Sequence, residues 1–247
     1  MRVLLASDVH YKLPQYDWLY AVAQEFDAIV IAGDLLDIRS AVPIPAQAVA
    51  VSAQITRIGS RGTMLAASGN HDLDHLDLYG EKSARWLRQV TGNAVHVDDS
   101  SVLVGDTLFS VCGWWDGQQG RVALEQRLER DAQDRPARWA WVYHSPPSGS
   151  PLAWDGRREF GDDQVLAWID RFRPDMLLTG HIHQAPFVEG GGWVDQIGST
   201  WVFNAGQQPG PVPAHILIDL DADVAHWITA TERASVSLIE PFVRPTT

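Results

Sequence analysis

Five short runs of mostly apolar residues constrain the fold of this chain more than any other feature. They are Val3–Ala6, Ala28–Ala32, Thr63–Ala67, Ala140–Tyr143 and Asp175–Thr179. Runs of this length and composition are typical of strands buried on both faces of a parallel sheet. The longer stretches between most of them mix apolar and polar residues at roughly helical spacing. This alternation predicts an α/β fold.

The remaining sequence adds helices and further strands to this plan. Helices are expected over Tyr16–Glu25, Ala46–Ile58, Glu81–Val90, Val122–Asp131 and Asp163–Phe172. Additional strands are expected over Ala94–Val97, Ser101–Val104, Thr107–Val111, Trp193–Asp195, Ser199–Phe203, His215–Asp219 and Val224–Thr229. The strands after Phe187 follow one another across Gly- or Pro-rich turns, which favours a second, partly antiparallel sheet. We expect a single domain over residues 1–247, with residues 207–247 completing the second sheet.

Charge and composition exclude several classes of protein. The chain has 19 Lys and Arg against 31 Asp and Glu, a net charge of −12, which would repel a polyphosphate backbone and disfavours extended contact with nucleic acid. Its apolar stretches fall short of the ~20 residues that span a bilayer, so we expect a cytoplasmic protein with no membrane partner. Cys112, the one cysteine, lies in an apolar run and is interpreted as a buried structural residue rather than a reactive thiol.

Potential metal ligands follow each of the five apolar runs. They are Asp8 and His10 after the first run, then Asp34, Asn70 and His144, and finally His181 with His183. Because the carboxyl ends of parallel strands line up along one edge of a sheet, these turns should converge on a single crevice. Together they supply carboxylate, amide and imidazole donors, which can surround two divalent ions and leave positions for water.

Each of these pairs also has an ordinary structural explanation. Asp8 with His10, or Asp34 after a glycine, is typical of a turn or a helix cap, and His181 with His183 can be packed or surface histidines. The ordered set of seven is harder to explain by packing, so the sequence predicts a centre for two divalent metal ions.

The motifs Asp8-x-His10, Gly33-Asp34, Gly69-Asn70-His71, His144 and Gly180-His181-x-His183 resemble, in this order, those of the calcineurin-like metallophosphoesterase superfamily. The resemblance covers residues 8–183, and Asn204-Ala-Gly206 is similar to a further family element. It implies a four-layer α/β sandwich, in which two mixed β-sheets are flanked by helices and the metal site lies at the carboxyl ends of strands. The segments 34–39 and 70–72 lack the continuations that mark protein Ser/Thr phosphatases, so small phosphodiesterases and phosphatases are closer in plan.

The resemblance also implies a role for each matching residue. Asp8, His10 and His183 would hold one metal, Asn70, His144 and His181 the other, and Asp34 would bridge both. Manganese, iron and zinc all suit these donors. His71 would face the substrate as an acid or electrostatic stabiliser, oriented by Asp37, although Asp37 is equally typical of a helix cap. The expected reaction is hydrolysis of a phosphoester by a hydroxide that bridges the two ions.

Three functions follow from such a centre. The first is hydrolysis of small phosphodiesters, cyclic nucleotides among them, or of phosphomonoesters. The second is a nuclease with the same metals, which would normally need a basic channel. The third is a non-catalytic metal-binding scaffold. The expected partner is therefore a small phosphorylated substrate.

Several other residues are open to both a functional and a structural interpretation. Trp114, Trp115 and Trp154 could stack on a base, but packing within loops explains them as well. Arg157 and Arg158 could reach a substrate phosphate or form a solvated pair. A polar loop is expected around His75, and His96, His215 and His226 are interpreted as structural.

Overall fold

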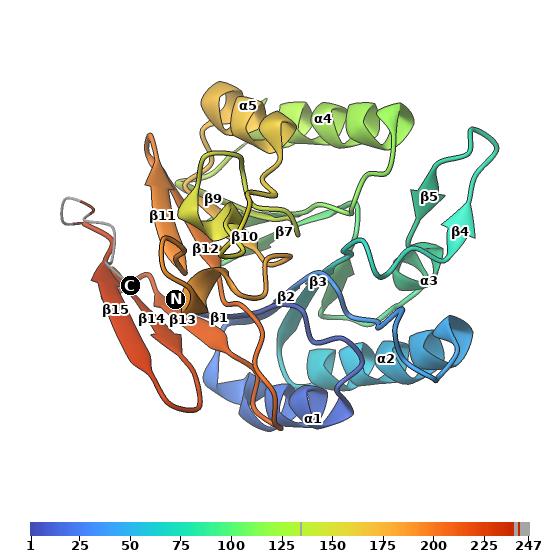
Figure 1. The fold of residues 1–247 in the computed structure, drawn as a ribbon. Helices are drawn as coiled ribbons and strands as arrows, with labels where there is room; N and C mark the ends of the chain where they lie inside the picture. Colours follow the sequence, from blue (N-terminus) through green and yellow to red (C-terminus); the bar gives the residue numbers. More distant parts are fainter. Residues whose placement is uncertain (134, 240–241, 243–247) are drawn as a thin grey trace.

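Two large mixed sheets form the centre of the molecule, and helices cover their outer faces (Figure 1). The computed structural model describes residues 1–133, 135–239 and 242. One sheet has the order β15 (Arg233–Ser237), β14 (Val224–Ile228), β13 (His215–Asp219), β1 (Arg2–Ala6), β2 (Ala28–Ala32), β3 (Thr63–Ala67), β6 (Val95–Val97). The other has the order β11 (Val194–Ile197), β12 (Thr200–Asn204), β10 (Met176–Thr179), β9 (Arg138–Val142), β8 (Thr107–Val111), β7 (Ser100–Val104). The predicted four-layer sandwich is confirmed.

Helices lie on both sides of this pair of sheets. Helices α1 (Leu13–Val22) and α2 (Ile44–Gly59) cover one outer face, and α4 (Gln118–Gln133) and α5 (Asp163–Phe172) cover the other (Figure 1). Short 3-10 helices occur at Ala23–Glu25, Pro151–Ala153 and Ala185–Phe187. Within the described residues, none of the helices combines the length and the apolar character that crossing a membrane would require.

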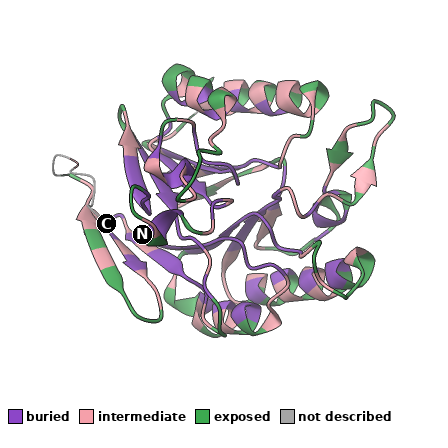
Figure 2. Cartoon of the chain, in the orientation of Figure 1, coloured by how far each residue is buried: buried purple, intermediate pink, exposed green. Residues whose placement is uncertain are grey.

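Alternation along the central strands divides the core into layers. Val3 and Leu5 of β1 pack between the sheets, whereas Leu4 packs against the layer of α1 and α2. This division follows because successive side chains of a strand point to opposite faces. On the other sheet, Trp139 and Trp141 face α4 and α5. Figure 2 shows buried residues concentrated in the two sheets and on the inner sides of the helices.

The five apolar runs all form strands, but not in one sheet. Strands β1, β2 and β3 pair in parallel in the seven-stranded sheet, and β9 and β10 pair in parallel in the six-stranded one. The later strands are divided as well: β12 pairs with β10, whereas β13 pairs antiparallel with β1. Residues 215–237 therefore extend the seven-stranded sheet, which contains the N-terminal strand. The expectation that this part of the chain completes the second sheet is wrong.

The helix predicted over Glu81–Val90 is wrong. A hairpin of β4 (His75–Leu76) and β5 (Lys82–Ser83) begins this region, and only a single turn of helix follows, α3 (Arg85–Arg88). The carboxylate of Glu81 accepts hydrogen bonds from the backbone N–H groups of Gln119 and Gly120, at the start of α4. This tertiary contact holds the chain extended where its local pattern favoured a helix. The other four helices form within a few residues of their predicted bounds.

A buried hydrogen-bonded chain connects the two sheets beyond the ends of their strands. Asp98, which follows β6, accepts hydrogen bonds from the backbone N–H and the hydroxyl of Ser68, at 2.7 and 2.6 Å. The hydroxyl of Ser68, which follows β3, accepts a hydrogen bond from the backbone N–H of Trp114 at 3.0 Å. Because Trp114 follows β8 of the other sheet, this chain fixes one sheet against the other. Burial raises the pKa of Asp98 to about 7.

The raised pKa of Asp98 predicts a pH-dependent contribution to stability. Native Asp98 keeps a proton that the unfolded chain releases near pH 4, so its contribution to the free energy of unfolding falls as pH rises from about 4 through about 7. Asp98→Asn stays neutral throughout. The stability of the wild type relative to this variant should therefore fall by roughly 3 kcal/mol between pH 5 and pH 8. Urea unfolding of both proteins at the two pH values tests this, and a constant difference would contradict it.

Candidate metal centre

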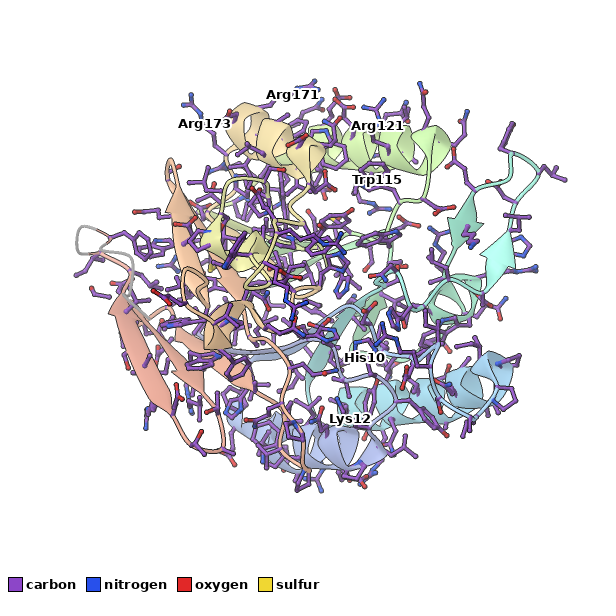
Figure 3. All side chains as sticks on the ribbon, viewed as in Figure 1. His10, Lys12, Trp115, Arg121, Arg171 and Arg173 are labelled. Atoms are coloured by element: carbon purple, nitrogen blue, oxygen red, sulfur yellow. The ribbon has the colours of Figure 1, made fainter. Side chains whose placement is uncertain are left out.

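Five of the seven predicted ligands come together where strands of both sheets end. Asp8 and His10 follow β1, Asp34 follows β2 and His183 follows β10, and ligand atoms from these four residues all lie within 4.8 Å of one another. His144, which follows β9, joins them through an Nε2 atom 3.3 Å from Asp34 Oδ2. The predicted convergence therefore occurs, although it joins the edges of two sheets. His10 lies between the two halves of the sandwich in Figure 3.

Two buried carboxylates organise the cluster. Asp8 Oδ1 lies 3.2 Å from His183 Nε2, and Asp34 Oδ2 lies 3.5 Å from His10 Nε2. The two imidazoles approach each other as well, with their Nε2 atoms 3.0 Å apart. The remaining carboxylate lone pairs are held by backbone donors: Asp8 accepts from the N–H of His181, and Asp34 Oδ1 accepts from the N–H of His71. Each carboxylate thus faces imidazole nitrogens on one side and a backbone N–H group on the other.

Burial and charge set the protonation of this group. Burial opposes ionisation of Asp8 and Asp34, but nearby imidazoles outweigh it and hold the pKa of both carboxyls below its usual value. Burial lowers the pKa of His10 to about 4, even though both carboxylates act in the opposite direction. Burial also lowers the pKa of His144, but the nearby carboxylates of Asp34 and Asp8 raise it more strongly, to about 9. The carboxylates are therefore ionised and His10 is neutral, whereas His144 carries a proton that a bound cation would displace from Nε2.

Two buried atoms show that the cluster fits metal ions. His144 Nδ1 lies 2.7 Å from the carbonyl oxygen of Ala32 and donates to it, which leaves Nε2 as the ligand atom. A carbonyl acceptor on the second ring nitrogen is the usual support of a metal-binding histidine. His144 Nε2 and Asn70 Oδ1 are both buried without a hydrogen-bond partner among the described residues. An unpaired buried polar atom is costly in a protein interior, and a bound cation is one partner that could satisfy such an atom.

Backbone strain is concentrated at the same residues. Asp8, His10, Asp34 and His181 all have positive φ values, between 45° and 72°. This region costs a non-glycine residue free energy and is populated mainly where the surrounding structure demands it. The three tight turns that contain these residues direct the ligands into one space.

Glycines before the ligands provide that space. A Cβ atom on Gly69 would lie 2.3 Å from Asp34 Oδ1 and 2.7 Å from His144 Cδ2. A Cβ atom on Gly180 would lie 2.6 Å from Asp8 Oδ2. The glycines in the Gly-Asn-His and Gly-His-x-His motifs thus have a steric purpose, because any side chain would displace a buried carboxylate.

His71 and Asp37 lie at the edge of the cluster. His71 Nε2 is 3.9 Å from Asp34 Oδ2, and the His71 and His10 rings meet edge to face with centroids 4.6 Å apart. A carboxylate oxygen of Asp37 and ring nitrogens of His10 and His71 lie within 4.8 Å of one another. Asp37 Oδ1 also accepts a hydrogen bond from the N–H of Arg39, two residues on. Asp37 therefore lies beside His71 and holds its own turn, but it is not the helix cap considered as the alternative, because α2 begins at Ile44.

Sequence reasoning missed residues that position the ligands. The buried carboxylate of Asp72 accepts hydrogen bonds from the N–H groups of Leu35, Leu36 and Gly69, and so ties the turn after β2 to the turn after β3. The Asn204 side-chain amide donates to the carbonyl oxygen of Ile182, between the two histidines of the last motif. The role of Asp72 could have been suspected from its position directly after Asn70-His71. The Asn204 contact could not, because it depends on strand pairing.

Of the tryptophans and arginines that the sequence offered for substrate binding, some lie against the predicted ligands and others pack within their loop. The Trp114 ring packs against two predicted ligands, with centroids 5.8 Å from His144 and 5.4 Å from His181. Trp154 Nε1 donates to the carbonyl oxygen of Glu189, and Arg158 lies over the Phe160 ring. These contacts favour loop packing for Trp154 and Arg158. The N–H groups of Arg157 and Arg158 both donate to Asp155.

The remaining candidates behave as structural residues. Cys112 is buried, and burial raises the pKa of its thiol. His215 is buried beside the carbonyl oxygen of Pro213, and His226 is hydrogen-bonded to Ser235 across two paired strands. His96 lies on β6, at the edge of its sheet.

Comparison with known proteins decides the family. The family model described as calcineurin-like phosphoesterase matches residues 1–185. The chain belongs to the calcineurin-like phosphoesterase family. It is therefore a metal-dependent phosphoesterase, and the scaffold alternative loses its support. A search of curated proteins found no match to this phosphoesterase.

Solved structures share the fold of this phosphoesterase at low sequence identity. The protein TT1561 of Thermus thermophilus has a TM-score of 0.60 at 16% identity, with 96% of this chain and 98% of that one covered. The purple acid phosphatase PPD1 from yellow lupin (Lupinus luteus) seeds has a TM-score of 0.59 at 14% identity, with 96% of this chain and 53% of that one covered. At such identities the likeness concerns the fold alone.

The close approach at Gly69 predicts how the centre can be damaged without changing a ligand. In Gly69→Ala the new methyl group would push Asp34 and His144 apart, so bound metal should fall at least severalfold. Gly62→Ala is the matched control, because its Cβ would come no closer than 3.4 Å to any neighbour. Metal content after dialysis measures the effect, with circular dichroism to confirm folding. Wild-type metal content in Gly69→Ala would contradict the steric argument.

Proposed function

We propose that this phosphoesterase hydrolyses small phosphoesters, phosphodiesters or phosphomonoesters, at a centre that holds two divalent ions. The convergence of Asp8 and Asp34 with imidazoles from both sheets carries the proposal. Asp8, His10 and His183 would hold one ion, and Asn70, His144 and His181 the other. Asp34 would contact both, because its Oδ2 atom lies within 3.5 Å of ring nitrogens from each set. Manganese, iron and zinc all match these donors.

The open side of the cluster indicates where substrate would bind. The side chains of Asp8 and His144 are fully buried, whereas those of His71 and His183 keep 14% and 30% exposure. A phosphoester would therefore approach past His71 and His183. When bound, two ions would supply Lewis acidity toward the phosphoryl oxygens and activate a water molecule.

His71 is the residue of this chain best placed to assist the leaving group. Its ring is held by contact with His10 and by the bond from its own N–H to Asp34. Its side chain is partly exposed on the open side, so it can hold a proton near the departing oxygen. Asp37, within 4.8 Å of the same histidines, would orient the ring.

Small substrates fit the charge of the chain better than long nucleic acids. Even with two divalent ions bound, adding +4 to −12 leaves a net charge of −8. A polyphosphate strand would meet repulsion over most of the surface. A cyclic nucleotide or another small ester brings one or two charges, which the ions themselves can neutralise.

A substrate panel tests this function. Bis(p-nitrophenyl) phosphate, p-nitrophenyl phosphate, cyclic nucleotides and single-stranded DNA are compared with added manganese, iron or zinc and with a chelator. Turnover of small esters that the chelator abolishes is the expected result. Activity confined to DNA, or no turnover with any metal, would contradict the proposal.

The same panel separates the role of His71 from that of the metals. In His71→Ala, metal content should remain at the wild-type level. Turnover should fall roughly 10²-fold or more for esters with a poor leaving group and less for p-nitrophenyl esters, which need little protonation. An equal loss on both kinds of ester would rule out proton donation by His71.

A further inference from the structure

A second concave site adjoins the metal centre and is lined in part by positive side chains. This arginine pocket, of about 660 Å³, lies between the β4–β5 hairpin, α3 and α4. Five cationic residues line it: Lys82, Arg85, Arg88, Arg127 and Arg130. Four acids, Asp77, Glu81, Asp99 and Asp116, line it as well, so the lining has an excess charge of +1 in a chain whose net charge is −12.

The spacing of the arginines directs them into the same space. Arg85 and Arg88 are three residues apart on α3, and Arg127 and Arg130 are three residues apart on α4. Residues at this spacing share one face of a helix, and both faces line the arginine pocket. Like charges facing one another are unfavourable unless a counter-charge lies between them.

The protein supplies that counter-charge for only one of these side chains. Arg88 pairs with Asp99 at 2.9 Å. Within the described residues, the side chains of Lys82, Arg85, Arg127 and Arg130 form no ion pair. Arg127 donates only to the hydroxyl of Ser101. The guanidinium groups of Arg85 and Arg130 therefore remain available to an external anion.

The other three acids that line the pocket bind backbone donors instead. Glu81 accepts from the N–H groups of Gln119 and Gly120, and Asp116 accepts from the N–H of Lys82 at 2.9 Å. Asp77 accepts from two N–H groups within its own turn. These contacts fix the walls of the pocket and leave its arginines in place.

One tryptophan connects the arginine pocket with the metal centre. Trp114 lines the pocket, and its ring also packs on His144 and His181. Its neighbour Trp115 lines the pocket as well and lies beneath α4 in Figure 3. Trp115 Nε1 is buried without a hydrogen-bond partner among the described residues. The two sites thus share Trp114 as a wall.

We propose that the arginine pocket binds a second phosphate group of the substrate whose phosphoester is held at the metal centre. Guanidinium groups bind phosphate oxygens through paired, charge-assisted hydrogen bonds, which makes phosphate the matching ligand. The proposal rests on the proposed function and narrows it to small esters that carry two phosphate groups.

Competitive inhibition tests this proposal with a matched pair of ligands. Adenosine 3′,5′-bisphosphate and adenosine 5′-monophosphate are titrated against turnover of whichever p-nitrophenyl ester the metal-loaded enzyme hydrolyses. The bisphosphate should inhibit competitively, at least about tenfold more tightly than the monophosphate. In Arg85→Gln/Arg130→Gln this advantage should shrink to within about twofold.

The control variant is Arg173→Gln/Arg233→Gln. It removes the same charge from two exposed arginines that do not line the pocket, and it should keep the tenfold advantage. An unchanged advantage in the pocket variant, or an equal loss in the control, would overturn the proposal. So would noncompetitive inhibition by the bisphosphate, because the pocket would then bind an anion separate from the substrate.

Isothermal titration calorimetry distinguishes failure of the pocket from failure of the proposed function. Binding of the bisphosphate to metal-loaded protein is measured for wild type and both variants. If no p-nitrophenyl ester is hydrolysed, the proposed function fails, and calorimetry alone then decides whether the bisphosphate depends on Arg85 and Arg130. Equal affinity of wild type and pocket variant in calorimetry overturns the arginine pocket in either case.

Discussion

Two carboxylates buried where strands of both sheets end are the constraint on which this structure depends. Asp8 and Asp34 are almost without solvent, and burying a charge is costly unless it is compensated. Imidazoles from β9 and β10 approach these carboxylates from the other sheet, and backbone N–H groups hold their remaining oxygens. These two buried negative charges would destabilise an ordinary core, but here they form the part of the molecule that attracts cations.

The surrounding chain is shaped to keep these charges close. Positive φ values at four cluster residues and glycines beside the carboxylates bring backbone and ligand into contact. Asp72 joins two of the ligand turns, and the chain from Asp98 through Ser68 to Trp114 joins the two sheets. Trp114 then packs on His144 and His181, so the support of the fold and the support of the ligands are partly the same residues.

Strands and candidate ligands could be predicted from the sequence because both depend on local patterns of residues. Apolar runs of strand length identified β1, β2, β3, β9 and β10, and the polar residues after them identified the cluster. Which strands share a sheet could not be predicted, because pairing depends on long-range register: β13 joins β1 from more than two hundred residues away. The helix expected at Glu81–Val90 failed for a similar reason, since the Glu81 carboxylate binds the start of α4. The arginine pocket likewise appears only when α3 and α4 are placed on either side of it.

An anomalous difference map from manganese-soaked crystals tests most directly whether two cations share Asp34. We expect two peaks, one among Asp8, His10 and His183 and one among Asn70, His144 and His181, with Asp34 in contact with both. A map with fewer than two peaks at this cluster, or with a peak that Asp34 does not touch, would contradict this.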